Sequence, residues 1–284
     1  MPCRFGQSMT IHEKSTTNLL EWRSLDDQGQ PWFEGQFSLA PLALLENSDD
    51  EIGQRLLRIL KTAQLINPRF LGKPNAIVAE TTLEFPRNWG LGTSSTLIYM
   101  VAKWANVDPF VLQFQTLGGS AYDIACAGAT APLLYEKRKG EPILCTIDFD
   151  PPFKKNLGFV YLGKKQNSRE AIDYYRNQAG DKQRQIAQIT ELTKALAEAK
   201  DLPTFEQALK EHETIIADNL KLEKVQDLYF SDYWGVVKSL GAWGGDFVLV
   251  TSDVDADFTR AYFADKGFEV FLTYEEMIYA ELKT

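Results

Sequence analysis

Alternation between apolar and polar side chains predicts strands in the first third of the chain. Along residues 22–37, the polar Glu34 and Gln36 alternate with apolar or small residues such as Phe33, and this period of two is typical of a half-buried strand. The polar run 26–29 contains Gly29 and predicts a turn that divides the segment into two strands. The same period predicts further strands at residues 5–11 and 76–85.

Apolar residues that recur every three or four positions predict helices. Residues 49–66 show this spacing with charges between the apolar positions, and residues 96–104 are apolar on nearly every side, which predicts a buried helix. Further helices are predicted at 109–116, 168–200, 203–220 and 256–266, and further strands at 142–149, 158–163, 247–251 and 269–273. Strands and helices mixed in this way predict an α+β protein.

The segment Asp150-Pro151-Pro152 interrupts the pattern, and helical segments dominate beyond it. We therefore predict two domains, residues 1–155 and residues 156–284. A length of 284 residues is enough for two such domains.

Charge and composition remove several classes of function. The net charge is −9, whereas a nucleic-acid-binding surface normally needs a basic excess, so we expect no nucleic-acid partner. No apolar run reaches about 18 residues, and no signal-peptide pattern opens the sequence, so we expect a protein that neither spans a membrane nor is exported. Three cysteines without a Cys-x-x-Cys pair predict reduced thiols in the cytoplasm.

The two histidines limit the chemistry further. Neither His12 nor His212 belongs to a His-Glu-x-x-His metal motif. His212 shares the apolar side of its predicted helix with Leu209 and Ile216, so we expect it to be packed rather than catalytic.

The first segment that could carry chemistry is Gly90-Leu91-Gly92-Thr93-Ser94-Ser95, between a strand and an apolar helix. Glycines permit a tight turn, and the start of a helix offers free backbone N–H groups and the positive end of its dipole to an anion such as phosphate. The alternative is a capped buried helix with Thr93 or Ser94 as its N-cap.

Two better-known nucleotide loops do not fit. A dinucleotide fingerprint requires a third glycine where Ser95 stands and an acid about 20 residues further on. Residues 158–165 approach a Walker A motif but end in Lys165, and their interior is predicted to be a strand.

Two further glycine-rich segments stand out. In Gly118-Gly119-Ser120-Ala121-Tyr122-Asp123, the acid is either a helix cap or first-turn acid, or a carboxylate that orients or deprotonates a substrate hydroxyl. In Gly241-Ala242-Trp243-Gly244-Gly245-Asp246, the glycines precede an apolar strand and indicate either close backbone approach to a ligand or a hairpin turn.

Taken together, these segments resemble the GHMP kinases, which phosphorylate galactose, homoserine, mevalonate and phosphomevalonate. That family carries Pro-x-x-x-Gly-Leu-Gly-Ser-Ser-Ala-Ala, then Gly-Ser-Gly-x-Asp, then a late glycine-rich loop. The matching residues are Pro86, Gly90, Leu91, Gly92 and Ser94; then Gly119, Ser120, Tyr122 and Asp123; then Gly241, Ala242, Gly244 and Gly245. The order and spacing agree over nearly the whole chain. Tyr122-Asp123-Ile124-Ala125 is most similar to the phosphomevalonate kinase-like branch and its GYDIA group.

The resemblance implies a domain like ribosomal protein S5 domain 2 followed by a ferredoxin-like domain. It also indicates a shortened start, because the family opens with a strand carrying Lys-x-x-Leu-x-Gly-Glu. Roughly the first 25 to 30 family positions have no counterpart before Arg4-Phe5-Gly6.

The resemblance also implies a mechanism. ATP phosphates would lie on residues 90–95 at the start of the helix, and Ser94 would help to hold Mg²⁺. Asp123 would be the catalytic base or orienting group beside the acceptor. Ser120, Tyr122, Gly241, Ala242 and Gly244 would contact the substrate. The substrate would be a small molecule, with mevalonate or phosphomevalonate, and hence the mevalonate pathway of isoprenoid synthesis, expected first. Phosphoryl transfer requires mainly positioning and charge neutralisation, which such groups supply.

Some positions depart from the family pattern. The family's upstream metal-binding Glu has no counterpart within residues 111–115, and Trp243 places a large side chain where the family has small ones. The alternative is therefore a protein of this fold that binds nucleotide or metabolite without transferring phosphate, and a decarboxylase of the same fold ranks below it. A phosphate on the acceptor would be contacted by four polar residues, Lys164, Lys165, Ser168 and Arg169, or these side chains would simply be solvated. We expect the protein to be a monomer or a homodimer.

Overall fold

The computed structural model describes residues 1–14, 18–72, 76–163, 182–241 and 245–279. The chain divides into two compact units, and the division falls between Ile147 and Asp148, ahead of the boundary predicted after residue 155. A short segment, Asn88–Gly90, belongs with the second unit although the chain on either side of it belongs to the first.

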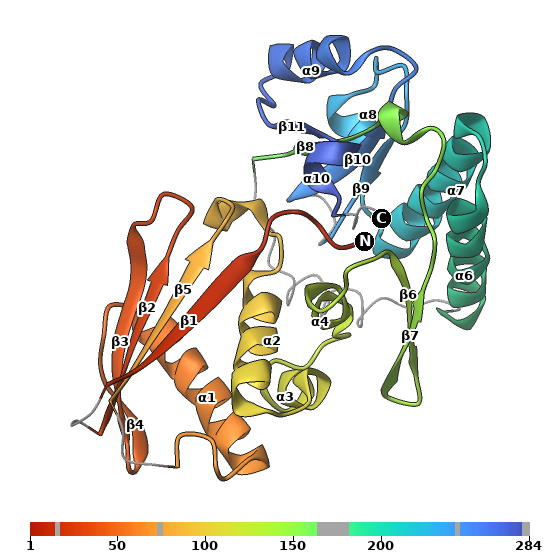
Figure 1. Cartoon of the computed structure of the whole chain (residues 1–284). Coiled ribbons are helices and arrows are strands. Elements are labelled where there is room, and N and C mark those ends of the chain that lie inside the picture. The colour runs from red at the N-terminus through yellow and green to blue at the C-terminus, as the bar shows by residue number, and fades with distance from the viewer. Residues whose placement is uncertain (15–17, 73–75, 164–181, 242–244, 280–284) are drawn as a thin grey trace. The chain divides into compact units, whose positions relative to one another are not determined.

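The first unit is a sheet with helices on one face (Figure 1). Its strands stand in the order β1-β5-β2-β3-β4, with β2 parallel to β5 and the other neighbours antiparallel. A separate ribbon pairs β6 with β7. The elements are β1 (Gln7–Lys14), β2 (Leu19–Leu25), β3 (Pro31–Leu39), β4 (Leu42–Asn47), α1 (Asp50–Ile66), β5 (Ala76–Leu83), a 3-10 turn (Arg87–Trp89), α2 (Thr93–Ala105), α3 (Pro109–Thr116), α4 (Tyr122–Ala127), β6 (Leu133–Arg138) and β7 (Glu141–Thr146).

Alternation places the core of the first unit between sheet and helices. In β5 every second residue from Ile77 to Leu83 is buried, as predicted. These side chains and those of β2 and β3 pack against the apolar sides of α1 and α2 in one cluster. The predicted turn is also present, because the Asp26 side chain accepts hydrogen bonds from the backbone N–H groups of Gln28 and Gln30.

The second unit contains a sheet in the order β11-β8-β10-β9, antiparallel throughout. Along the chain β8, helices, β9, β10, α9 and β11 follow one another, which is the β-α-β-β-α-β order of a ferredoxin-like fold. The elements are a 3-10 turn (Lys154–Asn156), β8 (Leu157–Tyr161), α6 (Lys182–Glu198), α7 (Leu202–Leu220), α8 (Val225–Tyr229), β9 (Val237–Ser239), β10 (Phe247–Thr251), α9 (Ala256–Asp265), β11 (Phe271–Thr273) and α10 (Tyr274–Met277).

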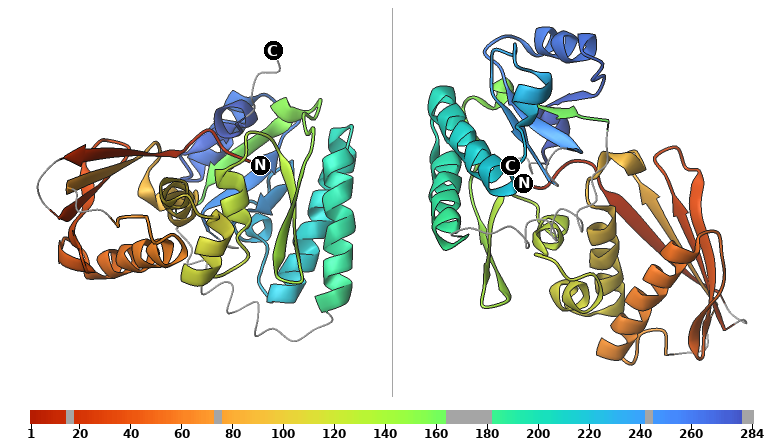
Figure 2. Two further views of the ribbon diagram at one scale, coloured as in Figure 1. Left: turned by 60° about the horizontal axis from the view of Figure 1, so that its bottom comes forward. Right: turned by 180° about the vertical axis from the view of Figure 1, so that it is seen from behind.

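Helices α6 and α7 lie side by side in this unit (Figure 2). The break predicted between these two helices is present, but it lies at residues 199–201 rather than at 202–204, because Leu202-Pro203-Thr204 already form the first turn of α7. Asp201 caps that turn, and Pro203 stands where a helix tolerates proline. The part of the helix predicted at 168–181 lies outside the described residues. The α+β class predicted from the sequence is confirmed.

Candidate functional site

The N-terminus of α2 carries no side-chain cap. Its N-cap is Gly92, in the left-handed conformation at φ 84°, and no side chain bonds to the first turn. The alternative with Thr93 or Ser94 as N-cap is therefore wrong: Thr93–Ser95 form the first helical turn itself. The Gly92 carbonyl accepts hydrogen bonds from the N–H groups of Ser95 and Thr96. The N–H groups before these point out of the helix end, where an anion can bind them.

The hydroxyl groups of this first turn are available as well. Thr96 uses its hydroxyl inside the fold, donating to Gln7 Oε1 at 2.7 Å. Within the described residues, by contrast, no hydrogen bond engages the half-buried hydroxyls of Thr93, Ser94 and Ser95. The turn thus presents three hydroxyl groups beside the helix end. A phosphate group or the water around a magnesium ion is bound by such groups.

The second glycine segment is held by side chains at three consecutive carbonyl groups. Gln113 Nε2 donates to the Gly118 carbonyl at 2.7 Å, and Lys137 Nζ donates to the Gly119 carbonyl at 3.0 Å. The Tyr135 hydroxyl donates to the Ser120 carbonyl. Because every one of these carbonyls is occupied, the turn that leads into α4 has a fixed course.

Asp123 lies in the first turn of α4 but does not cap it. The N-cap is Ala121, left-handed at φ 67°, and Asp123 is the second helical residue. Its side chain reaches solvent, yet the protein around it removes part of its hydration. This desolvation raises the pKa of the Asp123 carboxyl above its usual range, and a hydrogen bond with Tyr122 opposes the shift.

Helices α2 and α4 pack against each other, so the uncapped helix end and Asp123 belong to neighbouring elements (Figure 1). Gly128, the C-cap of α4, lies against the Tyr99 ring of α2, where a Cβ would come within 2.7 Å of Cε2. A larger residue at position 128 would require the Tyr99 side chain to shift.

In the second unit, buried charges surround the start of the third glycine segment. The Glu213 carboxylate is 2% exposed, accepts a hydrogen bond from the Ser239 N–H at 3.0 Å and lies 3.6 Å from Lys238 Nζ. Burial raises the pKa of Glu213 and lowers that of Lys238. Gly241 follows at φ 60°. The predicted substrate contacts Ala242 and Gly244, together with Trp243, lie outside the described residues, as do Lys164, Lys165, Ser168 and Arg169.

No protein-family model and no curated protein sequence matches the chain. Solved structures do match it. The phosphomevalonate kinase of Streptococcus pneumoniae, solved with phosphomevalonate and AMPPNP, aligns over 94% of this chain and 90% of its own, with a TM-score of 0.66 and 14% identity. The chain has the GHMP kinase fold.

Other structures with the GHMP kinase fold agree. The mevalonate kinase of Methanococcus jannaschii aligns over 91% of this chain and 85% of its own, with a TM-score of 0.65 and 14% identity. The galactokinase of Lactococcus lactis, solved with galactose, aligns over 98% and 88%, with a TM-score of 0.60 and 10% identity. At these identities the likeness shows the fold, and the roles of individual residues stay predictions.

Two sequence features that resembled other sites are structural. Residues 158–161 of the near-Walker segment lie in the buried strand β8, where they cannot form a loop around phosphates. His212 is packed as predicted: burial and the charge of Lys238 lower its pKa to about 4.

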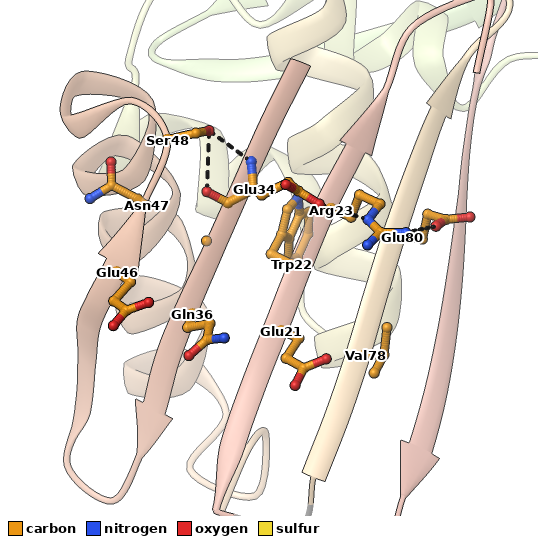
Figure 3. Close-up of a pocket in the computed structure, with 11 residues that line it drawn as sticks. Glu21, Trp22, Arg23, Glu34, Gln36, Glu46, Asn47, Ser48, Val78 and Glu80 are labelled. Atoms are coloured by element: carbon orange, nitrogen blue, oxygen red, sulfur yellow. Dashed lines mark hydrogen bonds and ion pairs between the residues drawn. The ribbon is translucent and has the colours of Figure 1, made fainter. Parts of the chain in front are cut away.

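A hollow of about 560 Å³ lies on the face of the five-stranded sheet away from the helices (Figure 3). Glu21, Glu34 and Glu80 line it, with Arg23 2.9 Å from Glu34 and 4.0 Å from Glu80. None of the predicted site residues lines this hollow. Its acids partly neutralise Arg23 and otherwise face solvent, so it is a polar sheet face rather than a candidate site.

Sequence reasoning missed the side chains that hold the site in place. Gln113 lies in the segment 111–115, which was noted only for its lack of an acid, and Tyr135 and Lys137 were not considered. Their partners are 5, 15 and 18 residues away in sequence. The signal that could have found Tyr135 and Lys137 is a strand directly after the small residues at 125–131, because such a strand would bring the chain back past the turn.

No helix within the described ranges combines the length and apolarity that crossing a membrane requires.

Proposed function

We propose that this protein is an ATP-dependent kinase that transfers the γ-phosphoryl group to a small metabolite. The observation that carries the proposal is the uncapped start of α2, packed on the helix that bears Asp123, in a chain with the GHMP kinase fold. The structure of a protein with this fold and bound AMPPNP supports a nucleotide as the phosphoryl donor.

In this proposal the first turn of α2 binds the ATP phosphates. Backbone N–H groups and the helix dipole favour the negative charge, and the hydroxyls of Thr93, Ser94 and Ser95 add donors. Gly90 and Gly92 take positive φ angles that let the backbone approach the phosphates. Such fixed donors stabilise the charge on the transferring phosphoryl group without having to reorganise during the reaction.

The residues present fit a magnesium ion that arrives with the nucleotide. Among the described residues, no three His, Cys, Asp or Glu side chains lie together in a way that could hold a metal ion. Ser94 offers a hydroxyl that no described residue engages, and Mg²⁺ commonly keeps waters and phosphate oxygens as most of its ligands. When bound, the ion would neutralise phosphate charge, with Ser94 as a protein ligand.

Asp123 acts on the acceptor. For a hydroxyl acceptor, its carboxylate takes the hydroxyl proton as the oxygen bonds to the γ-phosphorus and the bond to the β–γ bridging oxygen breaks, releasing ADP. A raised pKa makes the carboxylate a better proton acceptor. For a phosphate acceptor no proton needs to move, and Asp123 orients the substrate.

Mevalonate and phosphomevalonate are the acceptors that we expect first. The similarity of Tyr122-Asp123-Ile124-Ala125 to the phosphomevalonate kinase-like branch supports them, as do solved structures of a mevalonate kinase and a phosphomevalonate kinase with this fold. The test is ADP release from ATP and Mg²⁺ with mevalonate, phosphomevalonate, homoserine and galactose offered separately. Turnover with one acceptor supports the proposal, and absence of turnover with all four contradicts it.

A second candidate is a protein that binds nucleotide or metabolite without transferring phosphate. It is favoured by Gln113, which lies in the segment where the family carries a metal-binding Glu and instead holds the Gly118 carbonyl. Calorimetric titration separates the two candidates. Binding of Mg·ATP without ADP release under any acceptor would favour this second function.

A further inference from the structure

The segment that leads into the predicted phosphate loop is fixed to the second unit. Trp89 lies over Phe247 and Tyr161, with ring centroids 5.5 and 6.3 Å away. Tyr161 and Phe247 are partners across β8 and β10, so they form one aromatic surface. The Tyr161 hydroxyl donates to the Asn88 carbonyl at 2.7 Å. Asn88–Gly90 therefore has a defined seat on this sheet.

The last residue of that segment, Gly90, is closed in by Asp246. A Cβ at Gly90 would lie 2.9 Å from Asp246 Oδ2 and closer still to Oδ1. The Asp246 side chain is 7% exposed, and its backbone takes a left-handed φ of 52°. Its carbonyl accepts a hydrogen bond from the Leu162 N–H at 2.8 Å, which anchors it beside β8.

Gly92 and Gly241, the other glycines of the two segments whose surroundings are described, are not enclosed in this way. At Gly92 an added Cβ would meet nothing within 4 Å, and at Gly241 it would be in ordinary contact, 3.4 Å from Asp246 Oδ2. Asp246, the last residue of the third glycine segment, thus lies against Gly90, the first residue of the first glycine segment. Only Leu91 separates Gly90 from the N-cap Gly92, so a displacement of Gly90 is passed through one residue to the start of α2.

We propose that Asp246 is a positioning residue of the nucleotide site, whose carboxylate fixes Gly90 and thereby the first turn of α2. The inference rests on the proposed function, because it concerns the affinity of that site for nucleotide. Asp246 acts by shape: it fills the space beside Gly90, and the backbone turn keeps its course because both sides of it are occupied.

The negative charge of Asp246 would weaken nucleotide binding, whereas its shape would support it. A carboxylate near a bound polyphosphate repels it, so if charge dominated, removing the charge from Asp246 would strengthen nucleotide binding. Asparagine has the same shape without the charge, and alanine removes both. The variants Asp246→Asn and Asp246→Ala therefore separate the two effects.

The experiment measures the Mg·ATP dissociation constant by calorimetry and, separately, stability by urea unfolding of the full chain. The variants are Gly90→Ala, Asp246→Ala, Asp246→Asn and the double variant Gly90→Ala with Asp246→Ala. Gly29→Ala is the matched control, because Gly29 also has a positive φ of 73° but an added Cβ there meets nothing within 4 Å.

We expect Asp246→Ala and Gly90→Ala each to weaken Mg·ATP binding by about tenfold in folded protein. Asp246→Asn should stay within about threefold of the wild type, and Gly29→Ala should not change affinity. The double variant should bind more tightly than Gly90→Ala alone, because alanine at 246 leaves room for the new methyl group.

Three results would overturn the inference: unchanged affinity in Asp246→Ala with lowered stability only, tighter binding in Asp246→Asn, or a double variant no better than Gly90→Ala. Failure of the proposed function would look different, because the wild type would then either bind no Mg·ATP or bind it without releasing ADP. If the wild type binds no Mg·ATP, urea unfolding still tests the contact between Asp246 and Gly90. If Gly90→Ala lowers the stability and the added Asp246→Ala does not restore it, the inference is overturned as well.

Discussion

The first turns of α1 and α2 are built in opposite ways. In α1 the Asp49 carboxylate accepts a hydrogen bond from the Ile52 N–H, and two further acids follow in the first turn. In α2 the N-cap is Gly92, no side chain bonds to the turn, and no acid stands in it. Helices α3, α7 and α9 are capped in the same way as α1, by the side chains of Asp108, Asp201 and Asp255.

An acidic cap occupies the N–H groups that an external anion would need, and its charge repels that anion. The helices α4 and α8 also lack a side-chain cap, but each has an acid in its first turn. Among the α-helices whose N-cap the structure describes, α2 is therefore the one without an acid at its start, which suits a phosphate group. The capped helix ends stabilise the fold, whereas the uncapped start of α2 is the end that we propose binds the nucleotide phosphates.

The same contrast applies to two aspartates. Asp201 caps α7, and the hydrogen bonds that it accepts from Thr204 lower its pKa. Asp123 stands in the first turn of α4 without capping it, and desolvation raises its pKa. The Asp201 carboxylate is bonded to its own helix, whereas the Asp123 carboxylate caps no helix and is the group that we propose acts on the acceptor.

The largest expected effect is that of Asp123→Ala. Loss of the proton acceptor should lower kcat for a hydroxyl acceptor by about 10²- to 10⁴-fold, while the α2 end keeps its affinity for nucleotide. ADP release and calorimetric titration measure the two quantities. Asp257→Ala is the matched control, since Asp257 is also the second residue of a helix, α9, and is exposed; a similar loss in that variant would contradict the assignment.

The pH profile examines the same residue in the wild type. Because only the ionised carboxylate accepts a proton, and because its pKa is raised, kcat/KM should fall as pH decreases through a value above the ordinary aspartate pKa of about 3.9. A profile that stays level down to that ordinary value would show that Asp123 is not the base.

Ser94→Ala should have a smaller effect. Removing a hydrogen bond to a charged phosphate, and a ligand of its metal ion, should weaken Mg·ATP binding by about tenfold to a hundredfold. Calorimetry with Mg·ATP measures the change. Ser8→Ala, at an exposed position of β1, should leave the affinity unchanged, and equal affinities for Ser94→Ala and wild type would remove Ser94 from the site.

The smallest effect is expected at the capped helix. Asp49→Ala removes the bond to the Ile52 N–H and should lower the free energy of unfolding by about 1 kcal/mol. Urea unfolding measures this loss, and nucleotide affinity should not change. Weaker nucleotide binding in this variant would show that the two helix ends are not independent.

The sequence was sufficient for the parts of the fold that follow from local pattern. The bounds of α3 agree with the prediction for residues 109–116, and the turn at 26–29 is where its glycine and aspartates indicate. Strand β4 was missed because Leu42-Ala43-Leu44-Leu45 has no alternation and reads equally as helix. The short strand β9 exists because β10 pairs with it, which no local pattern shows.

The candidate site divides in the same way. The glycine segments and Asp123 were identified from local sequence and family resemblance. The contacts that hold them join distant residues: Tyr135 to Ser120, and Asp246 to Gly90. In the sequence, Asp246 stood out only as the last residue of the third glycine-rich segment. Its place beside Gly90 depends on the pairing of β8 with β10, so it emerged only from the structure.

The most direct test compares Gly92→Asp with Gly92→Ala by calorimetric titration with Mg·AMPPNP. Both substitutions share the strain of φ 84°, and neither Cβ meets another atom within 4 Å, so the difference between them isolates the acidic cap. The account predicts that the wild type binds the nucleotide and that Gly92→Asp binds it about tenfold more weakly than Gly92→Ala. Equal affinities in the two variants, or no binding to the wild type, would contradict the claim that the start of α2 binds the nucleotide phosphates.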